Sequence, residues 1–266
     1  MTSLAIIIVS YNARHDLERC LDSLASAPPT NSEIVVVDNA STDGSAGAVR
    51  DHPHVRLIQM PTNQGFAAAN NVGIRATSSE LVLLLNSDTI VPKGAVDLLV
   101  SALLSHPEVA IAGPRLVDGE GRVELSFGSM IGPLVEWRRQ RLMRALARQE
   151  PWAVSLVAAL TRDECYPDWV SGACLLVRRR DAEAVGLLDE RYFMYTEDVD
   201  FCAAVRRLGR RVLFTPSAQV VHLRGRSGAS NVVATRQAYE RSHLAFYQKH
   251  HPLLAPVLRL YRSIRG

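Results

Sequence analysis

The chain has no apolar run that approaches the roughly 20 residues required of a membrane-spanning helix. Its first apolar run, LAIIIV, is short and follows no basic segment, so it does not fit a signal peptide. The four cysteines, Cys20, Cys165, Cys174 and Cys202, show neither CxxC spacing nor a histidine-linked zinc pattern. We therefore expect a cytoplasmic protein without disulfides, in which Cys20 and Cys202 are small core residues.

Glycine-rich phosphate loops are also missing. The segment around the end of the first apolar run reads VSYNARHD and contains no glycine. A dinucleotide-dependent oxidoreductase would carry GxGxxG at this place, so that class is disfavoured. A nucleotidyltransferase that makes sugar nucleotides would need a glycine-rich, basic loop here, and we keep it only as an alternative.

The composition describes a folded globular protein with unevenly distributed charge. Hydrophobic residues make up 47% of the 266 positions and charged residues 21%, while the net charge is only +3. The chain is not a polycation, and we expect no nucleic-acid partner. Basic residues gather in WRRQRLMRALAR (137–148) and in RRR, RRLGRR and RGR of the last third. Such patches favour anionic partners, such as diphosphates or an acidic membrane surface.

Residues 137–148 and the tail 242–266 place Lys and Arg beside Trp, Leu, Tyr and Phe. One interpretation is peripheral attachment to the inner face of the cell membrane, close to a lipid-linked acceptor. The other is a homodimer interface or an ordinary solvated helix. The pattern does not decide between them.

Apolar runs alternate with helical patterns in the first half of the chain. Strands are predicted at 4–10, 33–38, 55–59, 81–86 and 109–113. Asn12 is expected to cap the helix after the first strand. Repeated βαβ units predict an α/β fold, with a mostly parallel, Rossmann-like sheet and helices on both faces. Ligands bind beyond the carboxyl ends of such strands, and Ser10, Asp38 and Asp88 fall at those ends.

The regular pattern weakens between residues 119 and 168 and then returns. Further elements are predicted as a strand at 170–178, a helix at 197–208, strands at 211–214 and 218–222, and a helical tail from 231 that Pro252 and Pro256 interrupt. We expect one domain over 1–226, with a nucleotide-binding half at 1–115 and an acceptor-binding half at 116–226. Residues 227–266 are expected to form a C-terminal helical extension.

Two strand ends carry carboxylates that suit nucleotide and metal binding. Asp38 can accept a hydrogen bond from the N3–H of uracil or thymine, with Asn39 assisting, or it can simply cap the next loop. Asp88 can hold a divalent cation that grips a diphosphate. His222 is a candidate second metal ligand, although a lone histidine is more often a structural hydrogen-bonding group.

The segment YTEDVDFC (195–202) places three carboxylates at the start of a predicted helix. Asp198 can act as a general base, with Glu197 beside it to orient or contact the acceptor. Asp200 is expected to cap the helix or to pair with an arginine. The simpler alternative is that all three acids favour the positive end of the helix dipole.

The segment NQGFAAANN (63–71) combines possible polar contacts, Asn63 and Asn70, with Gly65. Its three alanines keep it slim, so a base or ribose could approach the backbone. The alternative is a helix N-terminus that packs on the sheet through small residues.

The ordered motifs IIIVSYN, VVVDNASTDGS, NQGFAAANN, LLLNSD, VSGACLLVRR, YTEDVDFC and VVHLRG resemble the family 2 glycosyltransferases. These are inverting enzymes of the GT-A fold. The chain looks most like the rhamnosyltransferase-type branch that builds cell-surface polysaccharides. The resemblance covers Leu4–Arg226.

The resemblance implies a role for each motif. Donor contacts are implied for Ser10, Asn12, Asp38, Asn39, Asn63, Gly65, Asn70, Ser87 and Arg224. A Mg²⁺ or Mn²⁺ site is implied at Asp88 and His222, although Asn86 replaces the first acid of the family's DxD motif. Asp198 matches the catalytic base, with Glu197 beside it, and Gly172 and Ala173 lie in the segment near the acceptor. Arg226, together with Arg224, would neutralise the leaving diphosphate.

The expected reaction transfers a sugar from a UDP- or dTDP-sugar, with dTDP-rhamnose among the options, to a hydroxyl of a saccharide or lipid-linked acceptor. Asp198 would take the acceptor proton as its oxygen attacks the anomeric carbon, with inversion. A non-catalytic sugar-binding domain of the same fold is a further alternative. The presence of both Asp88 and Asp198 speaks against it.

Overall fold

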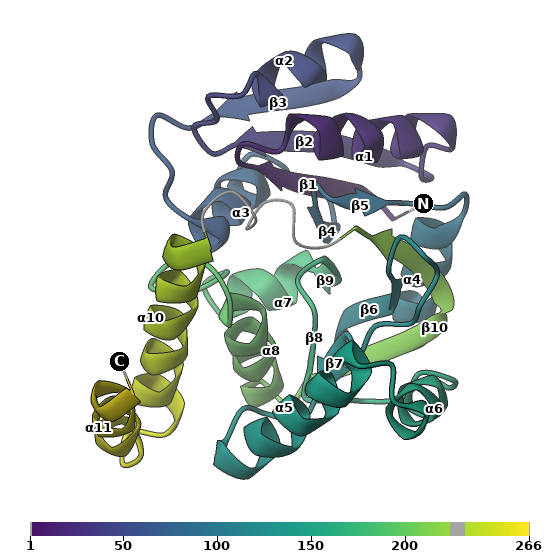
Figure 1. Ribbon diagram of the computed structural model, residues 1–266. Helices are drawn as coiled ribbons and strands as arrows, with labels where there is room; N and C mark the ends of the chain where they lie inside the picture. The colour runs from purple at the N-terminus through teal and green to yellow at the C-terminus, as the bar shows by residue number, and fades with distance from the viewer. Residues whose placement is uncertain (1, 224–231, 266) are drawn as a thin grey trace.

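The computed structural model describes residues 2–223 and 232–265 and places most strands in one large sheet (Figure 1). In spatial order its strands are β3 (Val55–Gln59), β2 (Ser32–Asp38), β1 (Leu4–Ser10), β4 (Leu81–Asn86), β9 (Cys174–Arg178), β6 (Val109–Val117), β10 (Arg211–His222) and β5 (Thr89–Ile90). The neighbours β3–β2, β2–β1, β1–β4 and β6–β10 are parallel. Strand β9 is antiparallel to β4 and β6, and β5 is antiparallel to β10. The predicted mostly parallel α/β sheet is confirmed.

Helices lie on both faces of this sheet, because successive residues of the central strands point to opposite faces. The helices are α1 (Arg14–Ser26), α2 (Ser45–Ala48), the 3-10 turn η1 (Val49–Asp51), α3 (Phe66–Arg75), α4 (Ala95–Ser105), α5 (Pro133–Ala147), α6 (Pro151–Leu160), α7 (Arg179–Ala184), α8 (Glu197–Arg207), α10 (Val232–His250) and α11 (Ala255–Arg265). Ile6 of β1 packs in the cluster that includes Leu21 of α1, whereas Ile7 packs in the cluster that includes Phe201 of α8. Burial on both faces explains why the run LAIIIV is apolar without alternation.

The strand predicted at 170–178 is two strands in the structure. The short strand β8 (Trp169–Val170) leaves the main sheet and pairs with β7 (Phe127–Gly128), while β9 joins the main sheet after Ser171–Ala173. In the opposite sense, the two strands predicted at 211–214 and 218–222 are the single strand β10, interrupted by a register shift between Thr215 and Gln219. A continuous apolar run does not reveal a change of partner strand, and a polar insertion does not reveal a bulge.

Two predicted helix boundaries are wrong. Asn12 does not cap α1, since it adopts a left-handed φ of 49° and its side-chain oxygen accepts a hydrogen bond from the Thr42 N–H at 2.8 Å. The first turn of α1 is instead held by Asp43, which accepts from the Arg14 N–H at 2.9 Å. Pro256 does not interrupt the tail but lies in the first turn of α11, where its missing N–H has no helical partner to lose.

The C-terminal helices α10 and α11 form a hairpin beside α8 (Figure 1). Phe246 of α10 is fully buried, and Lys249 donates to Asp200 of α8 at 2.8 Å. The predicted helical extension is therefore present, while the boundary predicted at residue 226, together with Arg224 and Arg226, lies outside the described residues. Across the described ranges, no helix has the combined length and apolar character needed to cross a membrane.

Candidate active site

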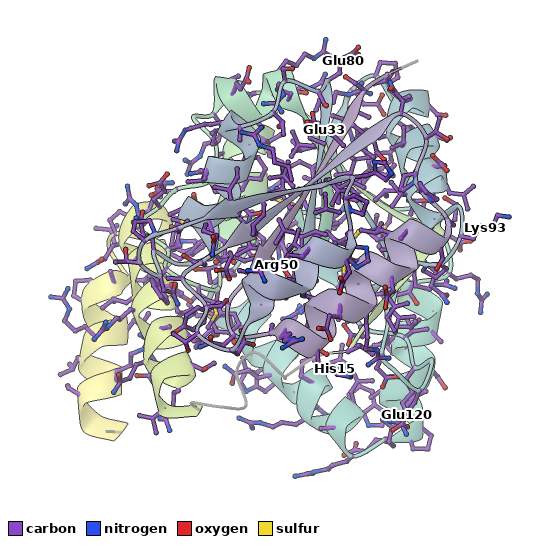
Figure 2. The ribbon with its side chains drawn as sticks, turned by 90° about the horizontal axis from the view of Figure 1, so that it is seen from above. His15, Glu33, Arg50, Glu80, Lys93 and Glu120 are labelled. Atoms are coloured by element: carbon purple, nitrogen blue, oxygen red, sulfur yellow. The ribbon has the colours of Figure 1, made fainter. Side chains whose placement is uncertain are left out.

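The predicted site residues gather where the parallel strands reach their carboxyl ends. Figure 2 looks along the sheet and shows Glu33 and Glu80, near the amino ends of β2 and β4, at one end of the molecule. His15 and Glu120, which follow β1 and β6, lie at the other end. The direction in which successive strands are added to the sheet reverses at β1, because β2 and β3 lie on one side of it and β4 lies on the other. Such a switch point opens a crevice at the carboxyl ends.

Several buried polar atoms at this edge lack a hydrogen-bond partner within the described part of the chain. Ser10 and Asp38 are paired in register at the ends of β1 and β2, and they are 1% and 2% exposed. The Ser10 hydroxyl, one Asp38 carboxylate oxygen and the Asn86 amide oxygen all remain unpartnered there. Each such atom costs about 1–3 kcal/mol unless something satisfies it. Their shared position therefore suits a polar ligand such as a nucleoside.

The loop that follows β2 is fixed by paired asparagines. The Asn39 amide donates to Asn63 Oδ1 at 2.9 Å and to the Gly65 carbonyl at 3.2 Å, and Asn39 Oδ1 accepts from the Gln64 N–H at 3.0 Å. Asn70 is fully buried, and its amide donates to the Phe66 carbonyl at 2.9 Å. These hydrogen bonds fix the segment between β2 and α3 at the carboxyl ends of the strands, and Ser87, 5% exposed, follows β4 at the same edge.

Gly65 is required by a protein contact rather than by room for a ligand. Its φ is +89°, and a Cβ there would lie 2.3 Å from the Phe193 carbonyl oxygen. The next N–H, of Phe66, donates to that same carbonyl at 2.7 Å. The alanines at 67–69 are buried, which agrees with the alternative of a helix N-terminus packed through small residues.

Asp88 and His222 are brought together by β5, a strand too short to have been predicted. Residues 221–222 of β10 pair with 89–90, and the Leu223 N–H donates to the Asp88 carbonyl at 2.8 Å. His222 Nε2 lies 3.4 Å from Asp88 Oδ1, and its Nδ1 lies 3.4 Å from Glu124 Oε2. Burial alone would lower the pKa of His222, but the carboxylates of Asp88 and Glu124 raise it to about 9. The ring, 13% exposed, therefore lies between two acids that favour its protonated form.

This arrangement fits a divalent cation that shares substrate oxygens. Over the described ranges, no group of three or more His, Cys, Asp and Glu side chains is arranged to hold a metal by itself. Asp88 Oδ1 and His222 Nε2 are nevertheless close enough to act as two ligands, and Glu124 on Nδ1 would fix the orientation of the ring, as carboxylates do behind metal-bound histidines. Because a ligating imidazole is neutral, binding would release the proton that Asp88 and Glu124 hold there.

Glu197 and Asp198 open α8 with their charges poorly compensated. Asp198 is partly exposed, its Oδ2 accepts from the Gly172 N–H at 2.8 Å, and its Oδ1 accepts from the Val199 N–H at 2.8 Å. Burial raises the pKa of the Asp198 carboxyl, while these N–H groups and the Arg139 charge oppose the rise. Burial and then the Asp198 carboxylate raise the pKa of Glu197 well above its ordinary value. Both carboxyl groups therefore hold a proton more readily than ordinary exposed acids do.

The segment Ser171–Ala173 joins the Asp88 region to the Asp198 region through two hydrogen bonds. The Asn86 N–H at the end of β4 donates to the Ala173 carbonyl at 3.0 Å, and the adjacent Gly172 N–H donates to Asp198. A Cβ on Gly172 would lie 3.2 Å from the Asp198 Cβ, so glycine permits the approach. Partial burial raises the pKa of Tyr195, and the charges of Glu197 and Asp88 raise it further. Tyr195 therefore lies within electrostatic reach of both acidic regions.

Asp200 has a different environment from the other two acids of its motif. Its carboxylate accepts from Lys249 Nζ at 2.8 Å and from the Tyr192 hydroxyl at 3.2 Å, and it lies 2.6 Å from His250 Nε2. The expected arginine partner is wrong: the lysine and histidine partners come from α10. Burial would raise the pKa of Asp200, but the His250 and Lys249 contacts lower it. Asp200 therefore fastens the C-terminal hairpin to α8.

Two elements of the site were not singled out from the sequence. Glu124 follows a tight turn in which the Asp118 carboxylate accepts from the N–H groups of Glu120 and Arg122. Its signal is the alternation VELSF after that turn, which is typical of an extended segment with one buried face. Arg139 lies 4.7 Å above the Trp169 ring and donates to the Leu125 and Phe127 carbonyls. One arginine within a basic helix carried no signal that set it apart.

Comparison with known proteins gives a consistent assignment. The model of the family described as Glycosyl transferase family 2 matches residues 5–162. The chain is 31% identical over 261 residues, covering 93% of it and 85% of the relative, to N-acetylglucosaminyl-diphospho-decaprenol L-rhamnosyltransferase of Mycobacterium tuberculosis. Its fold is similar to the mannosyltransferase PcManGT from Pyrobaculum calidifontis in complex with GDP-Man and Mn²⁺, with a TM-score of 0.64, 20% identity, and coverage of 97% of this chain and 68% of that one. It is also similar to GalNAc-T7 with UDP, GalNAc and Mn²⁺, with a TM-score of 0.62, 15% identity, and coverage of 84% and 44%.

The two solved neighbours establish the GT-A fold of the chain, and the family match agrees with the order of its motifs. The family model covers more than half of the chain, and the mycobacterial relative aligns with nearly all of it. The chain therefore belongs to glycosyl transferase family 2.

Proposed function

We propose that this protein transfers a sugar, with inversion, from a UDP- or dTDP-sugar to a hydroxyl of a lipid-linked saccharide. One observation carries the proposal. Asp198, a carboxylate with a raised pKa, accepts a hydrogen bond from the Gly172 N–H, and the adjacent Ala173 carbonyl accepts one from Asn86, two residues before Asp88. A base and a site for a diphosphate thereby share one edge. The mycobacterial relative, named as acting on a decaprenol-linked substrate with L-rhamnose, supports this class of donor and acceptor, including dTDP-rhamnose.

We assign nucleotide binding and acceptor binding to different halves of the chain. Residues 1–115 bind the nucleotide, with Asp38 and Ser10 facing the base and ribose and the loop of Asn39 and Asn63 closing the pocket. The unpartnered buried oxygens at this edge support that assignment. Residues 116–226 bind the acceptor, and Asn12 and Arg224 complete the donor contacts.

Asp198 acts as the general base of a single in-line displacement. The N–H groups of Gly172 and Val199 hold its two oxygens in a fixed orientation. Burial raises its pKa, which strengthens it as a proton acceptor. Glu197, whose pKa is raised well above its ordinary value by burial and by the Asp198 carboxylate, lies beside Asp198 and contacts or orients the acceptor. The acceptor oxygen bonds to the anomeric carbon as the bond to the diphosphate breaks.

Asp88 and His222 would hold Mg²⁺ or Mn²⁺, and the bound cation supplies charge that offsets the departing diphosphate. Two solved neighbours hold Mn²⁺, which supports a divalent cation for this fold. His222, as an imidazolium at neutral pH, already places positive charge beside Asp88 when no cation is bound. The pairing of β5 with β10 orients Asp88 and His222 toward each other.

The first experiment screens UDP-, dTDP- and GDP-sugars by thermal shift with and without Mn²⁺. A matched donor is expected to raise Tm by mass action, and Asp88→Asn is expected to remove the additional shift caused by Mn²⁺. Asp22→Asn, at a side chain 73% exposed on α1, is the matched control and should behave like the unaltered chain. Product stereochemistry by NMR tests inversion. Absence of any donor-dependent shift or transfer would favour the non-catalytic alternative.

A further inference from the structure

A groove of about 900 Å³ runs between α5 and α6, over the β7–β8 pair. Phe127 and Leu142 lie in its wall, and Trp137, Trp152, Leu156 and Leu160 line its rim. The four rim side chains are 58%, 47%, 40% and 44% exposed. A volume of this size is within the usual range of sites for small molecules. Large apolar side chains that are gathered and open to water mark a surface that something covers.

The rim of this groove is positively charged. Arg138 and Arg141 line it and are exposed, and neither forms an ion pair with an acid in the part of the chain that the structure describes. The one acid in the lining, Asp168, is already engaged by Arg206 at 2.7 Å and by the Met130 N–H at 2.6 Å. An apolar channel edged by uncompensated arginines is complementary to a molecule with a long apolar tail and an anionic head.

The lining of the groove contacts the segment that holds the proposed base. Arg139 lines it, donates to the carbonyls of Leu125 and Phe127, and contributes a charge that acts on Asp198. From the same wall, the Ser126 carbonyl accepts from the Ser171 N–H at 2.8 Å. The next N–H, of Gly172, holds Asp198. A ligand that enters along the groove is therefore led toward the proposed base.

We propose that the α5–α6 groove binds the isoprenoid chain of a lipid-linked acceptor, with its phosphate groups on Arg138 and Arg141 and its sugar directed toward Asp198. The proposal rests on the transferase function above for the direction of the sugar. It commits to a single prenyl chain as the occupant. Contact of α5 and α6 with a bilayer surface is a separate outcome of the test.

The chain carries its own reporter for this test. Its three tryptophans are Trp137 and Trp152 on the groove and Trp169 beneath Arg139. Intrinsic fluorescence of the full chain is titrated with a polyprenyl phosphate in neutral detergent micelles, with the corresponding polyprenol, and with phosphatidylglycerol vesicles that contain no prenyl lipid. We expect a saturable change with polyprenyl phosphate, a weaker one with polyprenol, and no comparable change with the vesicles.

Two double variants separate the apolar and the charged contribution. Leu156→Asp with Leu160→Asp is expected to weaken the binding of polyprenyl phosphate roughly tenfold or more, because the chain loses apolar surface to cover. Arg138→Glu with Arg141→Glu is expected to abolish the preference for polyprenyl phosphate over polyprenol. Leu98→Asp, at a leucine 49% exposed on α4, and Arg50→Glu, at an exposed arginine labelled in Figure 2, are the matched controls and should bind as the unaltered chain does. Circular dichroism and Tm confirm that each variant is folded.

The inference is overturned if polyprenyl phosphate gives no saturable change, or if a folded Leu156→Asp, Leu160→Asp protein binds it as tightly as the control. An equal response to vesicles without prenyl lipid overturns the single-chain occupant in favour of a bilayer surface. The transferase proposal fails separately. Asp198→Asn is expected to keep full polyprenyl phosphate binding, so binding without any sugar transfer by the unaltered chain would leave the groove assignment standing and remove the reaction.

Discussion

Helix α8 begins with acids that the fold treats in two opposite ways. Asp198 and Glu197 lie at the start of α8, where no cation of the described residues forms an ion pair with them and burial raises their pKa values. Asp200 faces the C-terminal hairpin, where Lys249 and His250 contact it and its pKa is lowered. The residue type and the helix turn are shared. The difference lies in their partners. Asp200 is paired with Lys249 and His250 and stabilises the fold, whereas Asp198 and Glu197 are the acids that the proposed function assigns to the substrate.

The same contrast extends to the surroundings of these acids. At the strand ends, Ser10, Asp38 and Asn86 have buried oxygens without partners among the described residues. In the hairpin interface, Glu136 of α5 accepts from both His243 and Tyr247 of α10, and Lys249 also pairs with Asp189 at 2.8 Å. On the proposed function, a bound substrate would supply the missing partners of Ser10, Asp38 and Asn86, whereas the acids of the hairpin interface already have theirs.

The largest expected effect comes from Asp198→Asn. Because the amide cannot accept the acceptor proton, sugar transfer should fall about 10³-fold, while donor binding stays within a factor of a few. The free energy of unfolding should stay the same or rise, since a carboxylate with a raised pKa is less stable in the fold than in water. Single-turnover kinetics and urea denaturation measure the two quantities. Transfer at an unchanged rate would remove Asp198 as the base.

Asp200→Asn should give the reverse pattern. Lys249 and His250 would face a neutral amide in a site that is 2% exposed, so the free energy of unfolding should fall by about 3 kcal/mol. The folded fraction should transfer sugar at nearly the normal rate. Asp189→Asn is the matched control, because it also contacts Lys249 but its side chain is 23% exposed, and it should cost about 1 kcal/mol or less. Equal losses in the two variants would contradict a distinct role for Asp200.

Gly65→Ala tests the contact that positions the segment ahead of α8. The new Cβ would meet the Phe193 carbonyl at 2.3 Å, and φ of +89° disfavours alanine, so we expect a loss of about 2 kcal/mol or more together with weaker transfer. Gly121→Ala has φ of +80° and no neighbour within 4 Å, so it isolates the backbone strain and should cost about 1 kcal/mol. If both variants lose the same stability, the close approach to Phe193 has no energetic weight.

The smallest effect concerns acid pH. A carboxylate with a lowered pKa contributes stability that is present above its unfolded pKa and lost as the pH falls through its folded value. The difference in unfolding free energy between the unaltered chain and Asp200→Asn should therefore be constant from pH 7 to about pH 5 and shrink below the ordinary pKa of 3.8. Urea denaturation at each pH measures it. A difference that persists unchanged at pH 3 would show that the effect is not electrostatic.

Sequence reasoning located the sheet because its signals are local. The strands β1, β3 and β4 have the predicted ends, since each is an apolar run bounded by polar or turn residues. The cysteine prediction also holds: Cys20 and Cys202 are fully buried, and all four thiols are free. Ser10, Asp38 and Asp88 of the candidate site were named for the same reason, as polar positions at the ends of apolar runs.

What the sequence could not supply was pairing between distant segments. Strand β5 has two residues, and only its contact with β10 makes it a strand, so no periodicity identifies it. Asp200 looked like its neighbours because a helix N-terminus favours acids in general, and its cationic partners lie some fifty positions later. Glu124 belongs to the candidate site because it contacts His222, which lies 98 positions later in the chain.

The pairing of β5 with β10 has a consequence for synthesis of the chain. Asp88 leaves the ribosome early, whereas His222 arrives only after most of the protein has been made. The two can meet only once the last strand has entered the sheet. On the proposed function, a nascent chain that lacks β10 could already present its base-binding residues, yet it would be unable to transfer the sugar.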